Sequence, residues 1–276
     1  MRALWLEHGF PRPRESGPPG PGENGRMAPG STHTRRHRQD AVLISAHRMG
    51  AGADRSRENT LAALEDAVAL GVDYIEFDVW RRDDGSFVVA HDPAHDVGLS
   101  YDAVLSAIGT RALAHIDLKF VSPGEDYDGG RAWEVDAARL AVESLGQDRM
   151  IVTTNHDRGV RAVRDWGDAE GLDLRVGLSL GTSVKRLSLL RRISVRRSEL
   201  LPAVRIRESR ANLVVAHHTL ARLGVAAFAR RRGLPLLVWT VDTPRGLRYW
   251  LRPGRAWLVT SNHPGQALRV RDEVRR

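Results

Sequence analysis

Cysteine is absent from this 276-residue chain, and lysine is nearly absent, because arginine supplies all but two of its 42 basic residues. Without cysteine the chain forms no disulfide and no thiolate metal site, so any metal must be bound through oxygen or histidine ligands. No apolar run approaches the ~20 residues of a membrane span, and residues 1–30 lack the apolar stretch of a secretion signal. We therefore expect a cytoplasmic protein.

The net charge of +8 is concentrated in two segments. Residues 185–210 contain nine basic and two acidic residues, and residues 1–40 contain seven arginines and four acidic residues, which leaves the remainder slightly acidic. A nucleic-acid-binding domain would need a basic surface of its own, so we expect no nucleic-acid partner. Residues 1–40 are rich in Pro, Gly and Arg and have the composition of a disordered tail.

From Ala41 onward, short apolar runs alternate with helix-like segments, as is typical of a parallel sheet or barrel. Nine runs are predicted as strands: 42–46, 73–79, 86–90, 115–120, 150–155, 175–180, 212–218, 235–241 and 257–261. The run 86–90 follows its predecessor after a turn that is too short for a parallel crossover, so these two strands form a β-hairpin. The other eight predict a (β/α)8 TIM barrel, a single α/β domain over residues 41–276 with a β-hairpin after the second barrel strand. A doubly wound open sheet uses similar units, but no Gly-rich phosphate loop follows the first strand.

Several expected helices are marked by their end residues. Asn59 or Thr60 is a candidate N-cap, and Gly71 a candidate C-cap, for a helix between them. Thr243-Pro244 is a cap followed by a first-turn proline, and it predicts a helix reaching Trp250.

Three acidic residues occupy two neighbouring barrel strands. Glu76 and Asp78 stand at i and i+2 and therefore point to the same face, and Asp117 and Lys119 repeat this relation on the next barrel strand. Three carboxylates in a chain without cysteine suit a hard cation, Mg²⁺ or Ca²⁺. Such an ion polarises a phosphoryl oxygen, while Arg48 and Lys119 offset the remaining negative charge.

Two histidines stand at predicted strand ends. His47 closes the first strand, and the hairpin returns His91 to the same mouth. Phosphodiester cleavage needs one proton removed from the attacking oxygen and one given to the leaving alkoxide, and the ordinary histidine pKa suits both tasks near neutrality. Singly, such residues are more often surface histidines, solvated acids or ion pairs. Their co-occurrence on apolar strands favours a site, because buried carboxylates need a cation or hydrogen-bond donors.

Together these motifs resemble the glycerophosphodiester phosphodiesterase family over about residues 43–264. The matching motifs occur in the order His47-Arg48, Glu58-Asn59-Thr60, Glu76-Phe77-Asp78, Asp84-Gly85, His91-Asp92, Asp117-Leu118-Lys119 and Val238-Trp239-Thr240-Val241-Asp242.

The resemblance implies metal-dependent hydrolysis of glycerophosphodiesters to glycerol 3-phosphate and an alcohol, often through attack by the neighbouring glycerol hydroxyl. By residue, it implies His47 and His91 as the acid/base pair, Arg48 and Lys119 as phosphate ligands, Trp239 as a pocket wall, Glu76, Asp78 and Asp117 as metal ligands, and Glu58 with Asn59 as groups orienting Arg48 or the metal site.

The chain departs from the family pattern in four places, one of which is a shorter segment than usual between His91 and Asp117. Met49 replaces the usual glycine, and we expect it to narrow the pocket or to shift the following loop. Asp117 is one methylene shorter than the usual glutamate, which shortens its reach to a metal. The usual Thr-Asp near the last strand is Thr260-Ser261 here.

Other functions remain open on the sequence alone. The enzyme could act on lysophospholipids or another phosphodiester, or the barrel could be catalytically impaired and bind phospholipid head groups. Leucines and arginines interleave in residues 185–210, which indicates either a basic amphipathic segment in weak contact with anionic membrane or a barrel helix with a solvated arginine face. The oligomeric state is not predicted.

Overall fold

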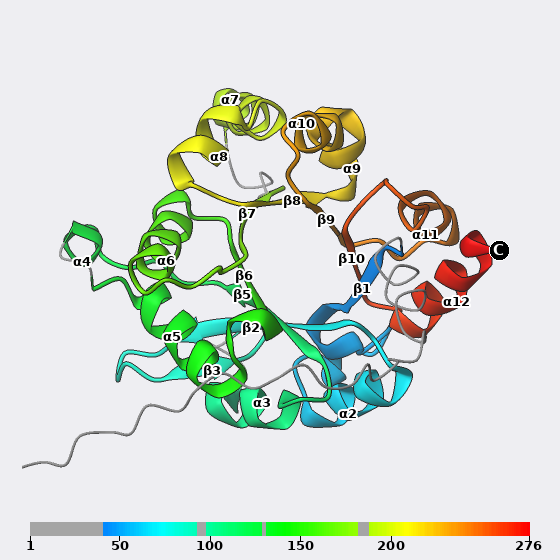
Figure 1. The fold of residues 1–276 in the computed structure, drawn as a ribbon, viewed down its shortest axis with the longest axis horizontal. Helices are drawn as coiled ribbons and strands as arrows, with labels where there is room; N and C mark the ends of the chain where they lie inside the picture. Colours follow the sequence, from blue (N-terminus) through cyan, green and yellow to red (C-terminus); the bar gives the residue numbers. More distant parts are fainter. Residues whose placement is uncertain (1–40, 93–97, 129–130, 182–187) are drawn as a thin grey trace, which may run out of the picture.

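Eight parallel strands close into a barrel in the computed structural model, which describes residues 41–92, 98–128, 131–181 and 188–276. The strand order is β1-β10-β9-β8-β7-β6-β5-β2, and pairing of β1 with β2 closes the ring. Helices surround the strands on the outside (Figure 1). The predicted (β/α)8 TIM barrel is therefore confirmed. The predicted tail, residues 1–40, lies outside the described residues.

The barrel strands lie within one or two residues of the expected runs at most of their ends. They are β1 (Leu43–Ala46), β2 (Tyr74–Arg81), β5 (Leu113–Leu118), β6 (Met150–Thr154), β7 (Val176–Leu180), β8 (Leu213–His217), β9 (Leu236–Trp239) and β10 (Leu258–Ser261). The expected hairpin strand is β3 (Phe87–Val89), antiparallel to β2. A two-residue strand, β4 (Leu99–Ser100), pairs with β3 and was not expected, because so short a run has no readable periodicity.

The helices follow the strands in the order that a barrel requires. The longer ones are α2 (Leu61–Leu70), α3 (Tyr101–Ile108), α5 (Trp133–Leu145), α6 (Asp157–Ala169), α7 (Leu189–Leu200), α8 (Ala203–Ser209), α10 (Ala226–Arg231), α11 (Pro244–Trp250) and α12 (Pro264–Arg275). The shorter ones are η1 (His47–Gly50), η2 (Arg55–Arg57), α4 (Gly124–Asp128), η3 (Gln147–Arg149), α9 (His218–Leu220) and the π-helical turn η4 (Ala221–Val225).

The expected helix ends are present. The Thr60 hydroxyl accepts a hydrogen bond from the Ala63 N–H at 3.2 Å, and Gly71 ends α2 with a φ of 73°, a conformation that glycine adopts without steric cost. Thr243 caps α11 in the same way, by accepting from the Gly246 N–H at 3.1 Å. No helix within the described ranges combines the length and hydrophobicity that crossing a bilayer requires.

Alternate strand residues divide the core in two. One set packs outward against the helices and forms the large core. The other set faces the barrel axis, where its apolar members form a smaller cluster of Tyr74, Ile151, Leu213, Val215, Leu237 and Leu258. Gly177 of β7 borders this cluster, and a Cβ there would lie 2.5 Å from Val215 Cγ2. The interior is thus filled by side chains up to the level of the polar residues above it.

His115 of β5 lies among these interior residues in a chain of buried hydrogen bonds. Thr153 donates its hydroxyl to Asp117 Oδ1 at 2.7 Å, so its oxygen accepts from His115 Nε2–H at 3.2 Å. The other ring nitrogen, Nδ1, then accepts from the Ser45 hydroxyl at 3.1 Å. The neutral ring satisfies every partner, and burial, aided by the charges of His47 and Lys119, lowers the pKa of His115 to about 3.

Gly177→Val should destabilise the barrel, because the added methyl groups have no room beside Leu213 and Val215. We expect a loss of about 1–3 kcal/mol in the free energy of unfolding, measured by urea denaturation. The matched control is Gly124→Ala in α4, where the nearest atom to an added Cβ is the flexible end of Arg158 at 3.5 Å. Equal stability of the two variants would contradict a filled interior.

The buried His115 should make the fold sensitive to acid. Its pKa is lower in the folded state (about 3) than the ordinary 6.5 of the unfolded chain, so between these values only the unfolded chain takes up the proton. The contribution of the neutral His115 to the free energy of unfolding is therefore complete above its pKa in the unfolded chain. As the pH falls below that pKa this contribution is lost, and the loss reaches about 2 kcal/mol at about pH 5. Urea denaturation of wild type and His115→Gln at about pH 8 and about pH 5 measures it. The control His263→Gln should keep the pH dependence of the wild-type free energy of unfolding, whereas His115→Gln should weaken it. If both variants keep the wild-type pH dependence, His115 is not the source of the acid sensitivity.

Candidate active site

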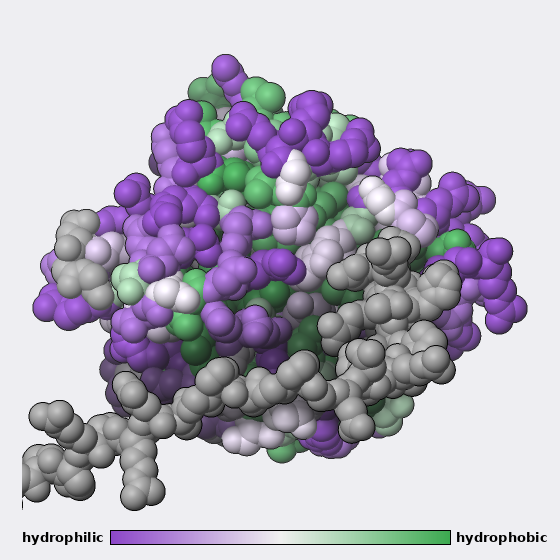
Figure 2. Space-filling model, in the orientation of Figure 1, coloured by the Kyte–Doolittle hydropathy of each residue, from purple (hydrophilic) through white to green (hydrophobic). Residues whose placement is uncertain are grey.

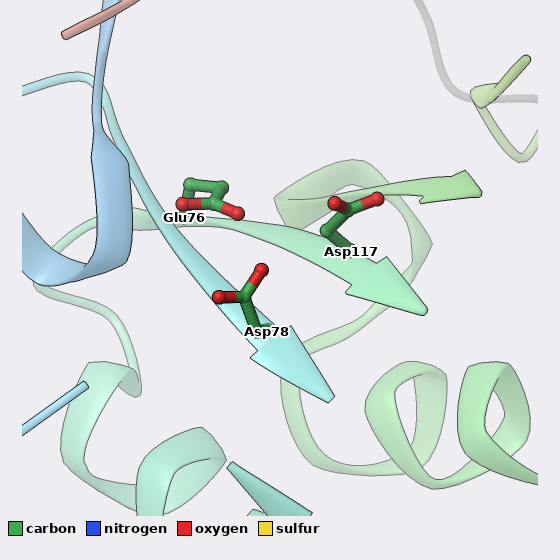
Figure 3. Close-up of side chains that lie close together, drawn as sticks. All are labelled: Glu76, Asp78 and Asp117. Carbon is green, nitrogen blue, oxygen red and sulfur yellow. The ribbon is translucent and has the colours of Figure 1, made fainter. Parts of the chain in front are cut away.

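Three carboxylates converge at the mouth of the barrel, where β2 and β5 lie side by side (Figure 3). Asp78 of β2 is the direct register partner of Asp117 of β5, and Glu76 stands two residues before Asp78 on the same face. One oxygen of each lies within 4.8 Å of one oxygen of the others, a spacing that could hold a metal ion. Asp117 joins the cluster despite its short side chain, because the parallel register sets it beside Asp78.

Asp78 is the most enclosed of the three, with its side chain 1% exposed. Lys119 Nζ lies 2.9 Å from Asp78 Oδ1, while Arg48 Nε and His91 Nδ1 lie 3.1 and 3.6 Å from Oδ2. Burial alone would raise the pKa of Asp78, but these three partners outweigh it and hold that pKa below its usual range. Asp78 is therefore an ionised carboxylate, balanced by Lys119, Arg48 and His91 although two further carboxylates lie beside it.

Glu76 has less support than its neighbour. It accepts one hydrogen bond from the Arg48 backbone N–H at 2.6 Å, and its side chain is 4% exposed. Burial, reinforced by the negative charge of Asp78, raises the pKa of Glu76 well above its usual value. Burial alone would lower the pKa of Lys119, but the negative charges of Asp117 and Asp78 outweigh burial and raise that pKa. With all three carboxylates ionised, the cluster would have more negative charge than Arg48 and Lys119 neutralise.

The turn after β1 has an unusual backbone. Arg48 and Met49 both have positive φ, 46° and 65°, a region that costs non-glycine residues on the order of 1 kcal/mol or more. Asn59 also has a positive φ of 56°, and its N–H donates to the Arg48 carbonyl at 3.1 Å. The turn directs the Arg48 side chain to Glu58 Oε2, at 2.7 Å, and to Asp78. The Asn59 side-chain oxygen accepts weakly from the Asp78 N–H at 3.4 Å.

The Met49 side chain points away from the site. It is fully buried within the outer core and does not line the cavity at the mouth. The expected narrowing of the pocket is therefore wrong. The positive φ shows why a glycine suits this position, and here burial of a large apolar side chain offsets the cost of that conformation.

His47 is oriented from the far end of the chain. Asn262 donates its amide N–H to Asp242 Oδ2 at 2.7 Å, so its amide oxygen accepts from His47 Nδ1–H at 2.7 Å. The neutral ring then keeps its lone pair on Nε2, which lies 3.9 Å from Glu76 Oε2. Burial lowers the pKa of His47, partly opposed by the bond to Asn262, so the neutral form is favoured near pH 7. Sequence reasoning did not single out Asn262 and Asp242 as partners of His47.

His91 stands at the rim, directly after β3. Its side chain is 47% exposed, and Nε2 lies 3.4 Å from Arg48 Nη1. The hairpin therefore brings His91 to Asp78 and Arg48 at the mouth of the barrel.

A cavity of about 530 Å³ opens above the carboxylates. His47, Arg48 and Lys119 line one part of it, and Trp239 and Gly181 line the part toward β7 and β9. The Trp239 ring packs edge-on against His217, with centroids 5.5 Å apart. Further polar lining residues that sequence reasoning missed are Thr153, Asn155, Ser179, Thr240 and Thr260. Their inward positions depend on strand register, and the only available signal was alternation along each strand.

Comparison with known proteins finds a partial family match and a shared fold. Residues 47–108 match the model of the Glycerophosphoryl diester phosphodiesterase family. A glycerophosphodiester phosphodiesterase from Parabacteroides distasonis is 15% identical with a TM-score of 0.63, over 86% of this chain and 100% of that chain. One from Agrobacterium tumefaciens is 19% identical with a TM-score of 0.60, over 84% and 99%. An Oleispira antarctica phosphodiesterase in complex with its product sn-glycerol-3-phosphate is 16% identical with a TM-score of 0.59, over 84% and 97%.

These solved structures are too distant in sequence to show more than the shared barrel. A search of curated proteins finds no match. The family match itself spans the segment from His47 to α3, which contains the proposed histidines and two of the three carboxylates. The chain thus matches the glycerophosphodiester phosphodiesterase family model over residues 47–108, and the barrel as a whole shares the fold of the solved structures.

Proposed function

We propose that the protein hydrolyses glycerophosphodiesters to glycerol 3-phosphate and an alcohol, using a divalent cation and a pair of histidines. The observation that supports this best is the meeting of three carboxylates, two cationic side chains and two histidines at one barrel mouth. The product-bound relative from Oleispira antarctica is consistent with a glycerol phosphate in such a barrel.

The donor set fits a hard divalent cation, Mg²⁺ or Ca²⁺. Glu76, Asp78 and Asp117 offer only oxygen ligands. The raised pKa of Glu76 indicates a buried carboxylate that lacks positive charge, and a cation beside it would favour its ionised form. When bound, the cation would polarise a phosphoryl oxygen of the substrate.

Arg48 and Lys119 would bind the substrate phosphate. Both now contact Asp78, and Lys119 also contacts Asp117. Neutralisation of the carboxylates by a cation would free these two side chains for a phosphate anion placed in the same cavity. Glu58 and Asn59 would keep Arg48 in position, and Trp239 would pack against the substrate from the opposite wall.

The two histidines would move the protons. The neutral His47 has its Nε2 lone pair free, so it would accept the proton of the glycerol hydroxyl as that oxygen attacks phosphorus. His91 at the rim would give a proton to the departing alcohol oxygen as the P–O bond breaks. Water would then open the resulting cyclic phosphate with the two histidines in reversed roles, which returns both to their starting protonation states.

His47→Ala and His91→Ala should each lower kcat on glycerophosphocholine by about 10²- to 10⁴-fold, because each removes one proton carrier. Release of glycerol 3-phosphate measures the rate, and KM should change little, since Arg48 and Lys119 remain. His156→Ala, a partly buried histidine at the N-cap of α6, is the matched control and should keep the wild-type rate. Wild-type rates in both test variants would disprove the acid/base pair.

Cation binding should depend on Thr153, which holds Asp117 through a 2.7 Å hydrogen bond. Thr153→Val should weaken binding of Mg²⁺ or Ca²⁺ by about 10- to 100-fold in calorimetric titration, whereas Thr153→Ser keeps the hydroxyl and the affinity. Thermal unfolding of both variants controls for misfolding. Equal affinity of the two variants would contradict this role for Thr153, and activity that survives complete chelation would remove the cation from the proposal.

A further inference from the structure

Helix α7 is an addition to the barrel plan. A (β/α)8 barrel needs one helix between β7 and β8, and α8 fills that place by packing against α6. Helix α7, Leu189–Leu200, precedes α8 in the same connection. It therefore belongs to a loop that leaves the carboxyl end of β7, on the side of the barrel where the carboxylates converge.

A buried contact fixes α7 beside the cavity. Glu199, which is 0% exposed, accepts a hydrogen bond from the Gly181 N–H at 2.8 Å and pairs with Arg196. Gly181 directly follows β7 and lines the cavity. Helix α7 also packs against η4. The carboxyl-terminal end of α7 is thus anchored to a residue that lines the cavity.

The outer face of α7 is apolar and uncovered. Within the described part of the chain, every large apolar side chain that is more than half exposed lies between residues 189 and 223; these are Leu189, Leu190, Ile193, Leu201, Val204 and Leu223. Leu190 is 81% exposed and Leu189 71%. Green apolar atoms emerge among purple hydrophilic ones at the top of the molecule, where Figure 1 places α7 (Figure 2). Exposed apolar side chains gathered in this way mark an interaction surface.

Arginine is part of this face. Leu189, Ile193 and Arg197 recur every four residues, so Arg197 stands in line with two exposed apolar side chains. Arg192, Ile193, Arg196, Arg197, Leu200 and Leu201 line a hollow of about 560 Å³ there. Neither Arg191 nor Arg197 has a carboxylate partner within the described residues, and Glu199, the one acidic residue of α7, is buried. The face is therefore both apolar and positively charged.

We propose that this face of α7, residues 189–201, docks the protein on the surface of an anionic phospholipid bilayer. Leucine and isoleucine side chains would enter the acyl boundary, and the arginines would extend to lipid phosphates, the arrangement of interfacial amphipathic helices. A second copy of the chain fits poorly, because a symmetric contact would place this arginine-rich face against the same positively charged face of the other copy. Since α7 is tied to Gly181, the bilayer would lie next to the cavity. This inference does not depend on the proposed activity.

The proposal is tested by cosedimentation with vesicles of phosphatidylcholine alone and of equimolar phosphatidylglycerol and phosphatidylcholine. Wild type should sediment with the anionic vesicles, should not sediment with phosphatidylcholine, and should be released at high salt. Binding to both vesicle types alike, or to neither, would overturn the proposal. Because this arm uses the wild-type chain, it does not depend on whether any variant folds.

Variants of exposed residues separate the apolar and the electrostatic contributions to vesicle binding. Leu189→Ser/Leu190→Ser/Ile193→Ser should weaken anionic-vesicle binding by more than about 100-fold, and Arg191→Gln/Arg197→Gln by about 30-fold. Arg191→Lys/Arg197→Lys keeps the charge and should bind as wild type does. The matched control, Arg231→Gln/Arg248→Gln, removes the same charge from exposed sites on α10 and α11 and should also bind normally.

Two results would refute a lipid-docking role for α7. One is wild-type vesicle binding in the α7 variants; the other is a concentration-dependent dimer, seen by light scattering, that the serine variant abolishes. The second result would identify the face as a contact between copies. Circular dichroism should show unchanged folding, since the substituted side chains are exposed.

Discussion

The carboxylate of Asp78 is the group around which the mouth of the barrel is organised. A buried carboxylate is costly to desolvate and persists only when well-placed cations and donors surround it. Its partners come from three separate elements: Arg48 from the turn after β1, His91 from the end of the β3 hairpin, and Lys119 from the end of β5. The barrel must close and the hairpin must form before this charge is satisfied, so fold and site depend on each other.

The strained turn after β1 contributes to the same arrangement. Positive φ at Arg48 and Met49 is held by contacts on both sides of the backbone: the Arg48 N–H donates to Glu76, and the Arg48 carbonyl accepts from Asn59. The buried Met49 side chain adds apolar contacts that a glycine could not make. The strain is therefore distributed over the core and the site, as is common where a backbone must present a side chain in one direction.

Helix α7 extends this organisation beyond the barrel. Its buried Glu199 accepts a hydrogen bond from the Gly181 N–H, while its opposite face exposes leucines and arginines. Residues 189–200 thus form a helix in addition to the barrel helix α8, with exposed leucines beside exposed arginines. The second polar network, from Ser45 through His115 and Thr153 to Asp117, supports the same mouth from within the barrel.

The sequence by itself determined the eight barrel strands, the hairpin and the positions of the motif residues, because these follow from local periodicity, turn length and the alternation of side chains along a strand. It also predicted that Glu76 and Asp78 share a face, since that depends on two residues of one strand. Most of the predicted site residues lie together at one mouth because they stand on or directly after the barrel strands, and parallel strands end on one side.

Only the tertiary structure decided the rest. His47 is oriented by Asn262, 215 residues away, and Asp117 by Thr153 on the next strand, and such contacts depend on register around the closed barrel. The inward or outward direction of Met49 depends on a φ angle that its residue type does not favour. The exposure of the α7 leucines depends on α8 having already filled the place of the barrel helix. Each is a property of packing between distant segments, which local sequence patterns do not specify.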